Sequence, residues 1–347
     1  MNENVNINKS GMKMINNTNE HFVSVVIPVK QGRYLEHAVS SLLVQDHRKM
    51  EIIIIDDNCS DADLVLIANM DSRIKVVTNP GRGLVDALNA GLNLAKGDCI
   101  ARMDADDLCV PNRISTQLRL LDEFSTPVII AARVEIFKTQ GEVDLGYKLY
   151  QEWLNGLVTP AEIARDFFIE SPLPHPTVLI PREVIDLVGL YRDGPWPEDY
   201  DYWLRAKSLG VSFAKPEAIL LRWRDDSDRT SRNDARYARE RFMFLKADYV
   251  EPLITNRKVY IWGSGETGLQ LYDALNVKGI EVSGFIDVHP RRIGKMKRNV
   301  PVYDLVTFLE LDGVTLCAVS VWGVREKIRK YMDENGKTET IDYWFFA

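Results

Sequence analysis

Acidic residues follow two hydrophobic stretches of this 347-residue chain. The stretch 52–57 ends in two aspartates, and the stretch 99–107 ends in Asp-Ala-Asp-Asp. Carboxylates brought together repel one another unless positive charge lies among them. Mg²⁺ and Mn²⁺ take oxygen ligands and commonly combine one or two carboxylates with substrate phosphates. The acids therefore predict a divalent-cation site that receives a phosphorylated ligand.

The elements around these acids decide whether they meet. Short β-rich runs alternate with helical patterns, which is typical of a wound, mainly parallel α/β sheet. Strands are predicted at 23–29, 51–56, 73–78, 99–104 and 127–132. Helices are predicted at 35–44, 61–70, 84–95 and 111–124. Ligands of such sheets bind outside the carboxyl ends of the strands, where both acidic clusters fall.

A structural interpretation competes with the metal site. Asp-rich turns often cap helices or form turns, and for one such turn this is the better interpretation. Two clusters that each end a hydrophobic strand of one sheet favour the cation.

Several motifs together resemble family 2 glycosyltransferases with the GT-A fold. They cover about residues 23–235 and stand in the family's order and spacing. They are VSVVIPV (23–29), IIIIDDNCSD (52–61), NPGRGLVDALNAGLNLAKGD (79–98), ARMDADDLCVPNR (101–113), HPTVLIPREVIDLVGLYRDGPWPEDYDYWLR (175–205) and LLRWRDD (220–226).

The resemblance implies roles for the nucleotide-sugar site. Pro28 and Val29 would lie against the nucleotide base, and Asp57 would accept a hydrogen bond from it. Asp106 would bind the metal directly, and Asp104 would reach the ribose or the metal. The implied cofactor is Mn²⁺ or Mg²⁺, and the implied donor is a nucleotide-diphosphate sugar, with a UDP-sugar expected.

Three further residues complete the implied site. Asp199 matches the catalytic base, which takes the proton of the acceptor hydroxyl. A base and a cation on opposite sides of the anomeric carbon imply direct displacement with inversion. His175, rigid between two prolines, would lie near the acceptor or the diphosphate, although a structural histidine is an equal alternative. Arg224 is the arginine of its segment that we expect to contact phosphate.

A second α/β unit is predicted after residue 257. Gly263, Gly265 and Gly268 form G-x-G-x-x-G after a strand and before a helix, and Asp287 ends the next strand. This context is that of a dinucleotide fingerprint. A second nucleotide site and simple tight packing of the glycines are both open. The expected domains are a disordered extension at 1–21, a GT-A domain at 22–250 and a small Rossmann-like domain at 257–347.

Composition narrows the partners and the compartment. The net charge of −7 argues against a nucleic-acid partner. No stretch has the length of a membrane span, although peripheral membrane contact and oligomers are compatible with the sequence. Scattered cysteines without C-x-x-C pairs predict reduced thiols and a cytoplasmic protein.

The expected function is transfer of a sugar to a glycan or lipid-linked acceptor, in surface polysaccharide or glycan assembly. One alternative is a nucleotidyltransferase, which shares the nucleotide-binding half but needs a Gly-rich basic loop after the first strand. The other is a non-catalytic scaffold that recruits partners through the C-terminal unit.

Overall fold

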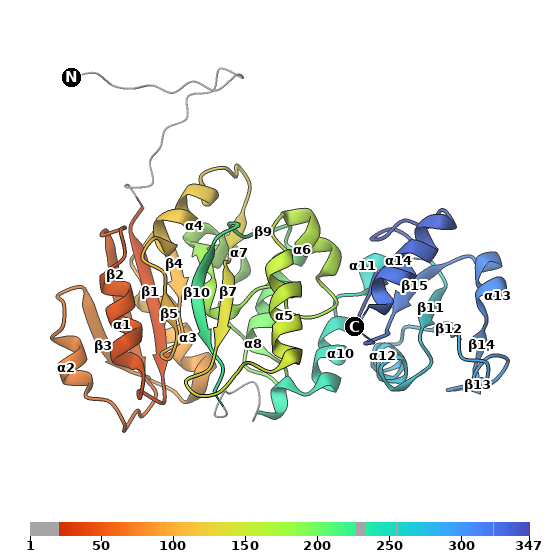
Figure 1. The fold of residues 1–347 in the computed structure, drawn as a ribbon, viewed down its shortest axis with the longest axis horizontal. Helices are drawn as coiled ribbons and strands as arrows, with labels where there is room; N and C mark the ends of the chain where they lie inside the picture. Colours follow the sequence, from red (N-terminus) through yellow and green to blue (C-terminus); the bar gives the residue numbers. More distant parts are fainter. Residues whose placement is uncertain (1–20, 227–233, 255, 322) are drawn as a thin grey trace, which may run out of the picture. The chain divides into compact units, whose positions relative to one another are not determined.

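The computed structural model describes residues 21–226, 234–254, 256–321 and 323–347. These residues form two compact units (Figure 1). The first contains the described residues up to 155 together with 173–190 and 210–225, and the second contains 156–172, 191–209 and the described residues from 226 onward. The domain limits 22–250 and 257–347 stay a prediction, and the expected extension at 1–21 lies outside the described residues except for His21.

A seven-stranded sheet forms the centre of the first unit. Its order is β3 (Ile74–Thr78), β2 (Met50–Asp56), β1 (Val23–Val29), β4 (Cys99–Arg102), β8 (Leu179–Pro181), β6 (Val128–Ile130) and β9 (Ser212–Ala214). The first four run parallel, and β8 is antiparallel to both of its neighbours. The predicted mainly parallel wound sheet is therefore confirmed, and the carboxyl ends of β1, β2 and β4 face the same edge.

The helices of this unit are α1 (Leu35–Leu43), α2 (Leu64–Ala68), α3 (Gly83–Leu94), α4 (Arg113–Leu121), α5 (Leu145–Gly156) and α7 (Arg182–Val188). Helix α2 is shorter than the predicted 61–70. The Asp63 carboxylate accepts a hydrogen bond from the Leu66 N–H, so Asp63 caps the helix and α2 begins one residue later.

A three-stranded sheet lies beside the point where β4 ends. It contains β5 (Leu108–Cys109), β10 (Ile219–Arg224) and β7 (Arg133–Phe137), with β10 in the middle. Strand β10 is antiparallel to β5 and parallel to β7. Because β5 directly follows the Asp-Ala-Asp-Asp segment, this pairing brings that segment next to the end of β10.

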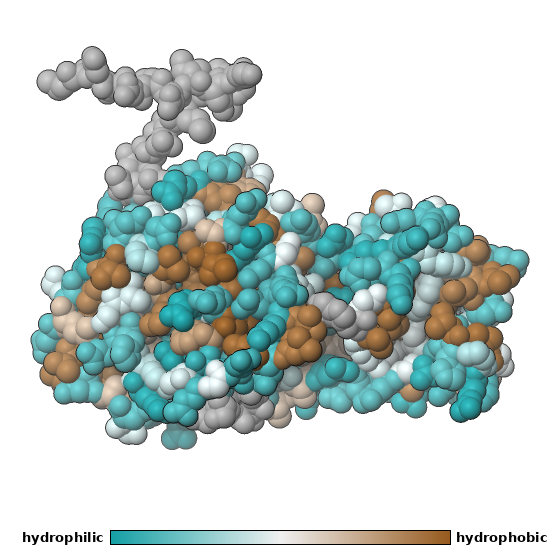
Figure 2. All heavy atoms as spheres, viewed as in Figure 1, coloured by the Kyte–Doolittle hydropathy of each residue, from teal (hydrophilic) through white to brown (hydrophobic). Residues whose placement is uncertain are grey.

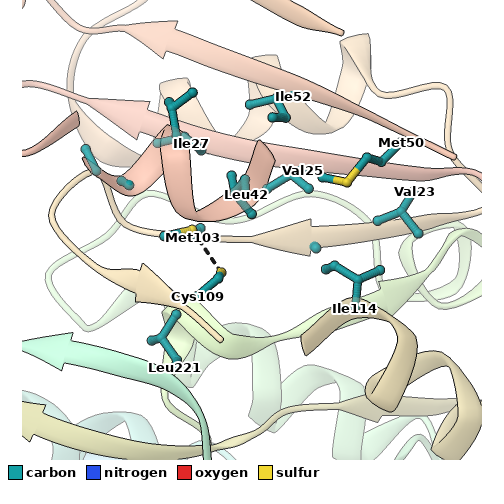
Figure 3. Packing of buried hydrophobic residues seen from close by; sticks show 14 of the residues in the cluster. Val23, Val25, Ile27, Leu42, Met50, Ile52, Met103, Cys109, Ile114 and Leu221 are labelled. Carbon is teal, nitrogen blue, oxygen red and sulfur yellow. Dashed lines mark hydrogen bonds between the residues drawn. The ribbon is translucent and has the colours of Figure 1, made fainter. Parts of the chain in front are cut away.

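The buried core of the first unit reaches directly under the acidic segment. Val25 of β1, Ile52 of β2 and Ile114 of α4 belong to one buried cluster (Figure 3). Met103, the residue between β4 and the acids, is in the same cluster, and the Cys109 thiol contacts its sulfur at 3.3 Å. Close-packed side chains of the core thus fix the residue that directly precedes the acidic segment.

The second unit is built on a six-stranded sheet, which confirms the predicted second α/β unit. Its order is β13 (Met296–Lys297), β14 (Val300–Tyr303), β12 (Val282–Ile286), β11 (Val259–Trp262), β15 (Val314–Cys317) and β16 (Tyr343–Phe345). Only β13 pairs in an antiparallel way. The helices are α6 (Pro160–Asp166), α8 (Glu198–Ser208), α10 (Arg239–Ala247), α11 (Glu251–Ile254), α12 (Glu266–Val277), α13 (Leu305–Glu310) and α14 (Val324–Glu334).

The C-terminal end of the chain is held inside this second unit. The Phe346 ring stacks on Phe168 with centroids 5.0 Å apart. The buried Lys246 ammonium donates to the carbonyl oxygens of Ile169 and Phe346, at 2.9 and 3.0 Å. Burial lowers the pKa of Lys246 to about 8. These contacts join the segment before residue 172 to the last residues of the chain.

Hydrophobic residues on the face drawn in Figure 2 occur in patches separated by hydrophilic ones. Among the described residues, no helix combines the length and the apolar character that crossing a membrane requires.

Candidate active site

The carboxylates after β4 form one cluster. Asp104, Asp106 and Asp107 each offer an oxygen, and these oxygens lie within 4.8 Å of one another. Asp104 and Asp106 are half-buried, and Asp107 is fully buried. Oxygen donors at this spacing suit a hard divalent cation such as Mg²⁺ or Mn²⁺. The predicted metal residues Asp104 and Asp106 are thus next to each other, although their role in binding metal stays a prediction.

Arg102 pairs with the first of these acids. Its guanidinium lies 2.7 Å from a carboxylate oxygen of Asp104. Met103, between them, points into the core, so Arg102 and Asp104 share the opposite face of the extended chain, as the period of two requires. Arg102 was not among the site residues predicted from the sequence. Its position two residues before Asp104 at the end of a strand was the signal that could have found it.

The last acid of the cluster is held by β10. The main-chain N–H of Arg224 donates to a carboxylate oxygen of Asp107 at 2.8 Å. The Arg224 guanidinium donates to the main-chain carbonyl of Asp106 at 2.8 Å and to the Thr139 hydroxyl at 2.7 Å. These contacts bind Arg224 to its own chain, and the predicted contact with phosphate stays a prediction.

The predicted base-binding residues lie at the neighbouring strand ends. Val29 is buried, and its carbonyl accepts a hydrogen bond from the Asp57 N–H at 2.8 Å. The Asp57 carboxylate accepts hydrogen bonds from the Asn79 side chain at 2.8 Å and from the Gly83 N–H at 3.0 Å. Asp57 therefore holds the loop that leads into α3. Pro28 is half-buried beside Val29, and contact of these residues with a nucleotide stays a prediction.

His175 is buried in the first unit, in a short 3-10 turn that spans His175–Thr177. Burial, together with the positive charge of Arg102, lowers the pKa of His175 well below its usual range. The imidazole is therefore neutral at pH 7. Arg102 also pairs with Asp104, so the arginine that lowers the pKa of His175 is the one that contacts the acidic cluster.

Three acids begin helix α8 in the second unit. The helix starts at Glu198, directly after Pro197, whose backbone is extended. Glu198 accepts a hydrogen bond from the Tyr237 hydroxyl at 3.0 Å, and Asp201 pairs with Arg205 at 2.9 Å. Both are buried, whereas Asp199 is half-buried, which makes it the most accessible carboxylate of this turn.

The glycine-rich loop of the second unit has the expected geometry. Gly263 has a φ of 110°, and a Cβ on Gly268 would lie 1.8 Å from the Gly263 carbonyl. Side chains are therefore excluded at both positions, as close packing of α12 on β11 requires. At Gly265 a Cβ would meet only the Arg292 guanidinium, at 3.5 Å.

Asp287 follows β12 and holds this loop. Its carboxylate accepts hydrogen bonds from the Ser264 hydroxyl at 2.6 Å and from the Arg292 guanidinium at 3.1 Å. Burial alone would raise the pKa of Asp287, but hydrogen bonds from Ser264, His289 and Arg292 together lower it. The carboxylate thus has partners within the chain, and the second nucleotide site stays a prediction.

Comparison with known proteins identifies the family. A family model described as glycosyl transferase family 2 matches residues 24–188. An uncharacterized glycosyltransferase of Haemophilus influenzae is 30% identical over 218 residues, which cover 60% of this chain and 67% of that protein. The chain belongs to glycosyltransferase family 2. It is therefore a glycosyltransferase, and metal dependence is typical of its family. The nucleotidyltransferase and scaffold alternatives are set aside.

Other similar proteins are named for polysaccharide synthesis or have solved structures. The amylovoran biosynthesis glycosyltransferase AmsE of Erwinia amylovora is 29% identical and aligns with 56% of this chain and 71% of its own. A mannosyltransferase of Pyrobaculum calidifontis, solved with GDP-Man and Mn²⁺, shows 16% identity and a TM-score of 0.49, with 73% of this glycosyltransferase and 68% of that chain covered. The match to S. aureus TarS covers 66% of this chain but only 40% of TarS, at a TM-score of 0.47.

Proposed function

We propose that this family 2 glycosyltransferase moves a hexosyl group, with inversion, from a UDP-sugar to a hydroxyl of a glycan or lipid-linked acceptor. The observation that carries the proposal is the carboxylate cluster of Asp104, Asp106 and Asp107 at the end of β4. Mn²⁺ or Mg²⁺ is the proposed cofactor, because the cluster offers only hard oxygen ligands.

The proposed chemistry replaces one bond at the anomeric carbon by another and moves one proton. The acceptor oxygen attacks the anomeric carbon while the bond from that carbon to the diphosphate breaks, and the nucleoside diphosphate leaves with the bonding electrons. Bound at Asp104 and Asp106, the divalent cation would supply positive charge for the leaving diphosphate. Asp199 would take the proton of the acceptor hydroxyl.

The contacts of helix α8 support the choice of Asp199. Glu198 is engaged by Tyr237 and Asp201 by Arg205, and both are buried, so neither presents its carboxylate to an acceptor as readily. Asp199 lies in the first turn, where the positive end of the helix dipole favours an ionised carboxylate.

The test is direct. Purified full-length protein is screened by thermal shift with UDP-, GDP-, ADP- and dTDP-sugars in Mn²⁺, in Mg²⁺ and in EDTA. We expect stabilisation by UDP-sugars that needs the metal, and metal-dependent release of UDP from the stabilising donor. Stabilisation that EDTA does not remove, with no release of nucleoside diphosphate from any donor, would contradict the proposal.

The compartment and the biological role of the enzyme are proposed from its cysteines and its relatives. We infer that the enzyme acts in the cytoplasm, since its four cysteines are free and three of them are buried. We also propose a role in surface polysaccharide or glycan assembly, which is supported by relatives such as AmsE and the Bacillus subtilis protein named putative glycosyltransferase EpsE.

A further inference from the structure

Arg224, the last residue of β10, is buried against two aromatic rings. Its side chain carries a permanent charge, yet the residue is only 6% exposed. The guanidinium carbon lies 3.8 Å from the centre of the Tyr34 ring and 4.6 Å from that of Phe137. Rings at such distances stabilise a cation through their negative faces. Contacts with two rings restrict the orientation of the planar guanidinium, and with it the directions in which its N–H groups point.

One of those N–H groups donates to the main chain of the acidic segment. Nε donates to the carbonyl of Asp106, and Nη1 donates to the Thr139 hydroxyl. The backbone N–H of the same arginine donates to the Asp107 carboxylate. Arg224 therefore holds two consecutive residues of the acidic segment. Its side chain holds Asp106, and its backbone holds Asp107.

The pairing of β10 with β5 and β7 also holds Arg224 next to the acidic segment. Arg222 of β10 pairs with Leu108 of β5, directly after the acids. Beyond Arg224, the Asp225 N–H donates to the Phe137 carbonyl at 2.8 Å, which keeps the end of β10 against β7. The Tyr34 hydroxyl lies 3.2 Å from the Thr139 hydroxyl. The contacts of Arg224 thus extend from the acidic segment to the residue that precedes α1.

We infer that Arg224 is a positioning residue that holds the Asp106 peptide so that the Asp106 carboxylate is directed at the cation before the cation binds. The inference rests on the proposed function, because it needs Asp106 to be a metal ligand. Its physical basis is that a fixed carbonyl restricts the rotation of the peptide that carries the ligand. Residues that orient metal ligands typically contribute about 10–100-fold to metal affinity.

This role differs from the phosphate contact expected for Arg224 from the sequence. An arginine that binds phosphate would change the affinity for the nucleotide and leave binding of Mn²⁺ alone unchanged. A positioning arginine changes the binding of Mn²⁺ alone. The two roles are therefore separated by one titration without nucleotide.

The experiment titrates Mn²⁺ alone into the full-length protein and follows free Mn²⁺ by electron paramagnetic resonance. Arg224→Lys keeps the charge but loses the planar guanidinium, and we expect about 10–100-fold weaker Mn²⁺ binding. The matched control is Arg222→Lys. Arg222 lies on the same strand and also contacts Phe137 at 4.6 Å, but it pairs with the exposed Glu135. We expect this control to bind Mn²⁺ as the wild type does.

A second readout separates positioning from general damage. In the metal dependence of donor hydrolysis, Arg224→Lys should raise the Mn²⁺ concentration needed for half-maximal rate, and saturating Mn²⁺ should restore the rate. If Arg224→Lys does not fold, Thr139→Val replaces it, because this change removes one acceptor of the guanidinium and keeps the acceptor at Asp106. Tyr34→Phe controls for the contact between the Tyr34 and Thr139 hydroxyls, which Thr139→Val also removes. Thr139→Val should weaken Mn²⁺ binding by a smaller factor.

Three results would overturn the inference. Mn²⁺ binding in Arg224→Lys equal to the wild type would do so, as would equal losses in Arg224→Lys and Arg222→Lys. With a misfolded Arg224→Lys, unchanged binding in Thr139→Val would do the same. In these cases loss of Mn²⁺ binding in Asp106→Ala would leave the proposed function standing. If the wild type and Asp106→Ala bind Mn²⁺ alike, the metal site itself fails, and the inference fails with it.

Discussion

The Arg102 guanidinium and the Asp104 carboxylate lie 2.7 Å apart, with the arginine side chain 6% exposed and the aspartate 32% exposed. A buried cation thus stands beside a proposed metal ligand before any metal is bound. Burying an unpaired guanidinium is costly, so the acid also stabilises the arginine.

Arg102→Met should therefore destabilise the protein. We expect a loss of about 1–2 kcal/mol in the free energy of unfolding, less than for a fully buried pair because water screens Asp104. Urea denaturation measures this loss. Arg222→Met is the control, since its pair with Glu135 is about half-exposed and should contribute less than about 1 kcal/mol. Equal losses in the two variants would show that the Arg102 pair is no stronger than a surface pair.

Asp106→Ala should abolish Mn²⁺-dependent binding of UDP and leave the fold intact. The change removes an oxygen ligand from the cluster, while the anchors of the segment, Met103 and Asp107, are kept. Calorimetry of UDP with and without Mn²⁺ measures the effect. Asp193→Ala removes the same charge at an exposed site and should bind normally. Unchanged UDP affinity in Asp106→Ala would refute its role as the metal ligand.

Asp199→Asn should lower the rate of transfer by about 10²–10⁴-fold, the usual contribution of a positioned base. Donor and metal affinity should be kept, because the amide is nearly the same shape as the carboxylate. The measurement is kcat with a saturating donor, beside calorimetry of the donor.

The neighbours of Asp199 supply the controls. Glu198→Gln and Asp201→Asn should lower transfer less, since these acids are engaged by Tyr237 and Arg205. If either of them abolished transfer and Asp199→Asn did not, the base would be assigned to the wrong carboxylate.

His175 should make the stability of the fold depend on pH. Its pKa in the folded protein lies well below the value of about 6.5 of an unfolded histidine. Below pH 6.5 the unfolded chain therefore binds a proton at His175 that the folded chain does not bind. The free energy of unfolding then falls as pH falls. The slope from one such group is at most about 1.4 kcal/mol per pH unit.

Unfolding by urea between pH 7.5 and 5.5 tests this. His175→Gln should flatten the pH dependence, and part of it should persist because burial also lowers the pKa of His47. His37→Gln, at an exposed position, should leave the curve unchanged. An identical slope in the wild type and in His175→Gln would contradict a buried neutral histidine.

The amino-acid sequence determined the strand ends and the acids on them. Periodicity alone located β1, β2, β3 and β4 to within a few residues, because buried parallel strands read as continuous apolar runs. The segment after β4 could be assigned to the edge of the sheet for the same reason. The glycine loop of the second unit was predicted from its motif between a strand and a helix. The motif is informative because a side chain at Gly263 or Gly268 would have no space.

Only the tertiary structure decided which partners these residues have. Arg224 lies 118 residues beyond Asp106 in the sequence. Its hydrogen bond to the Asp106 carbonyl depends on the pairing of β10 with β5 and β7, which no local pattern encodes. Which of the three acids of α8 is most accessible likewise depends on a distant residue. Tyr237, 39 residues after Glu198, donates a hydrogen bond to the Glu198 carboxylate. Local propensity acts over a few residues, whereas burial and hydrogen-bond partners are set by chain segments that meet only after folding.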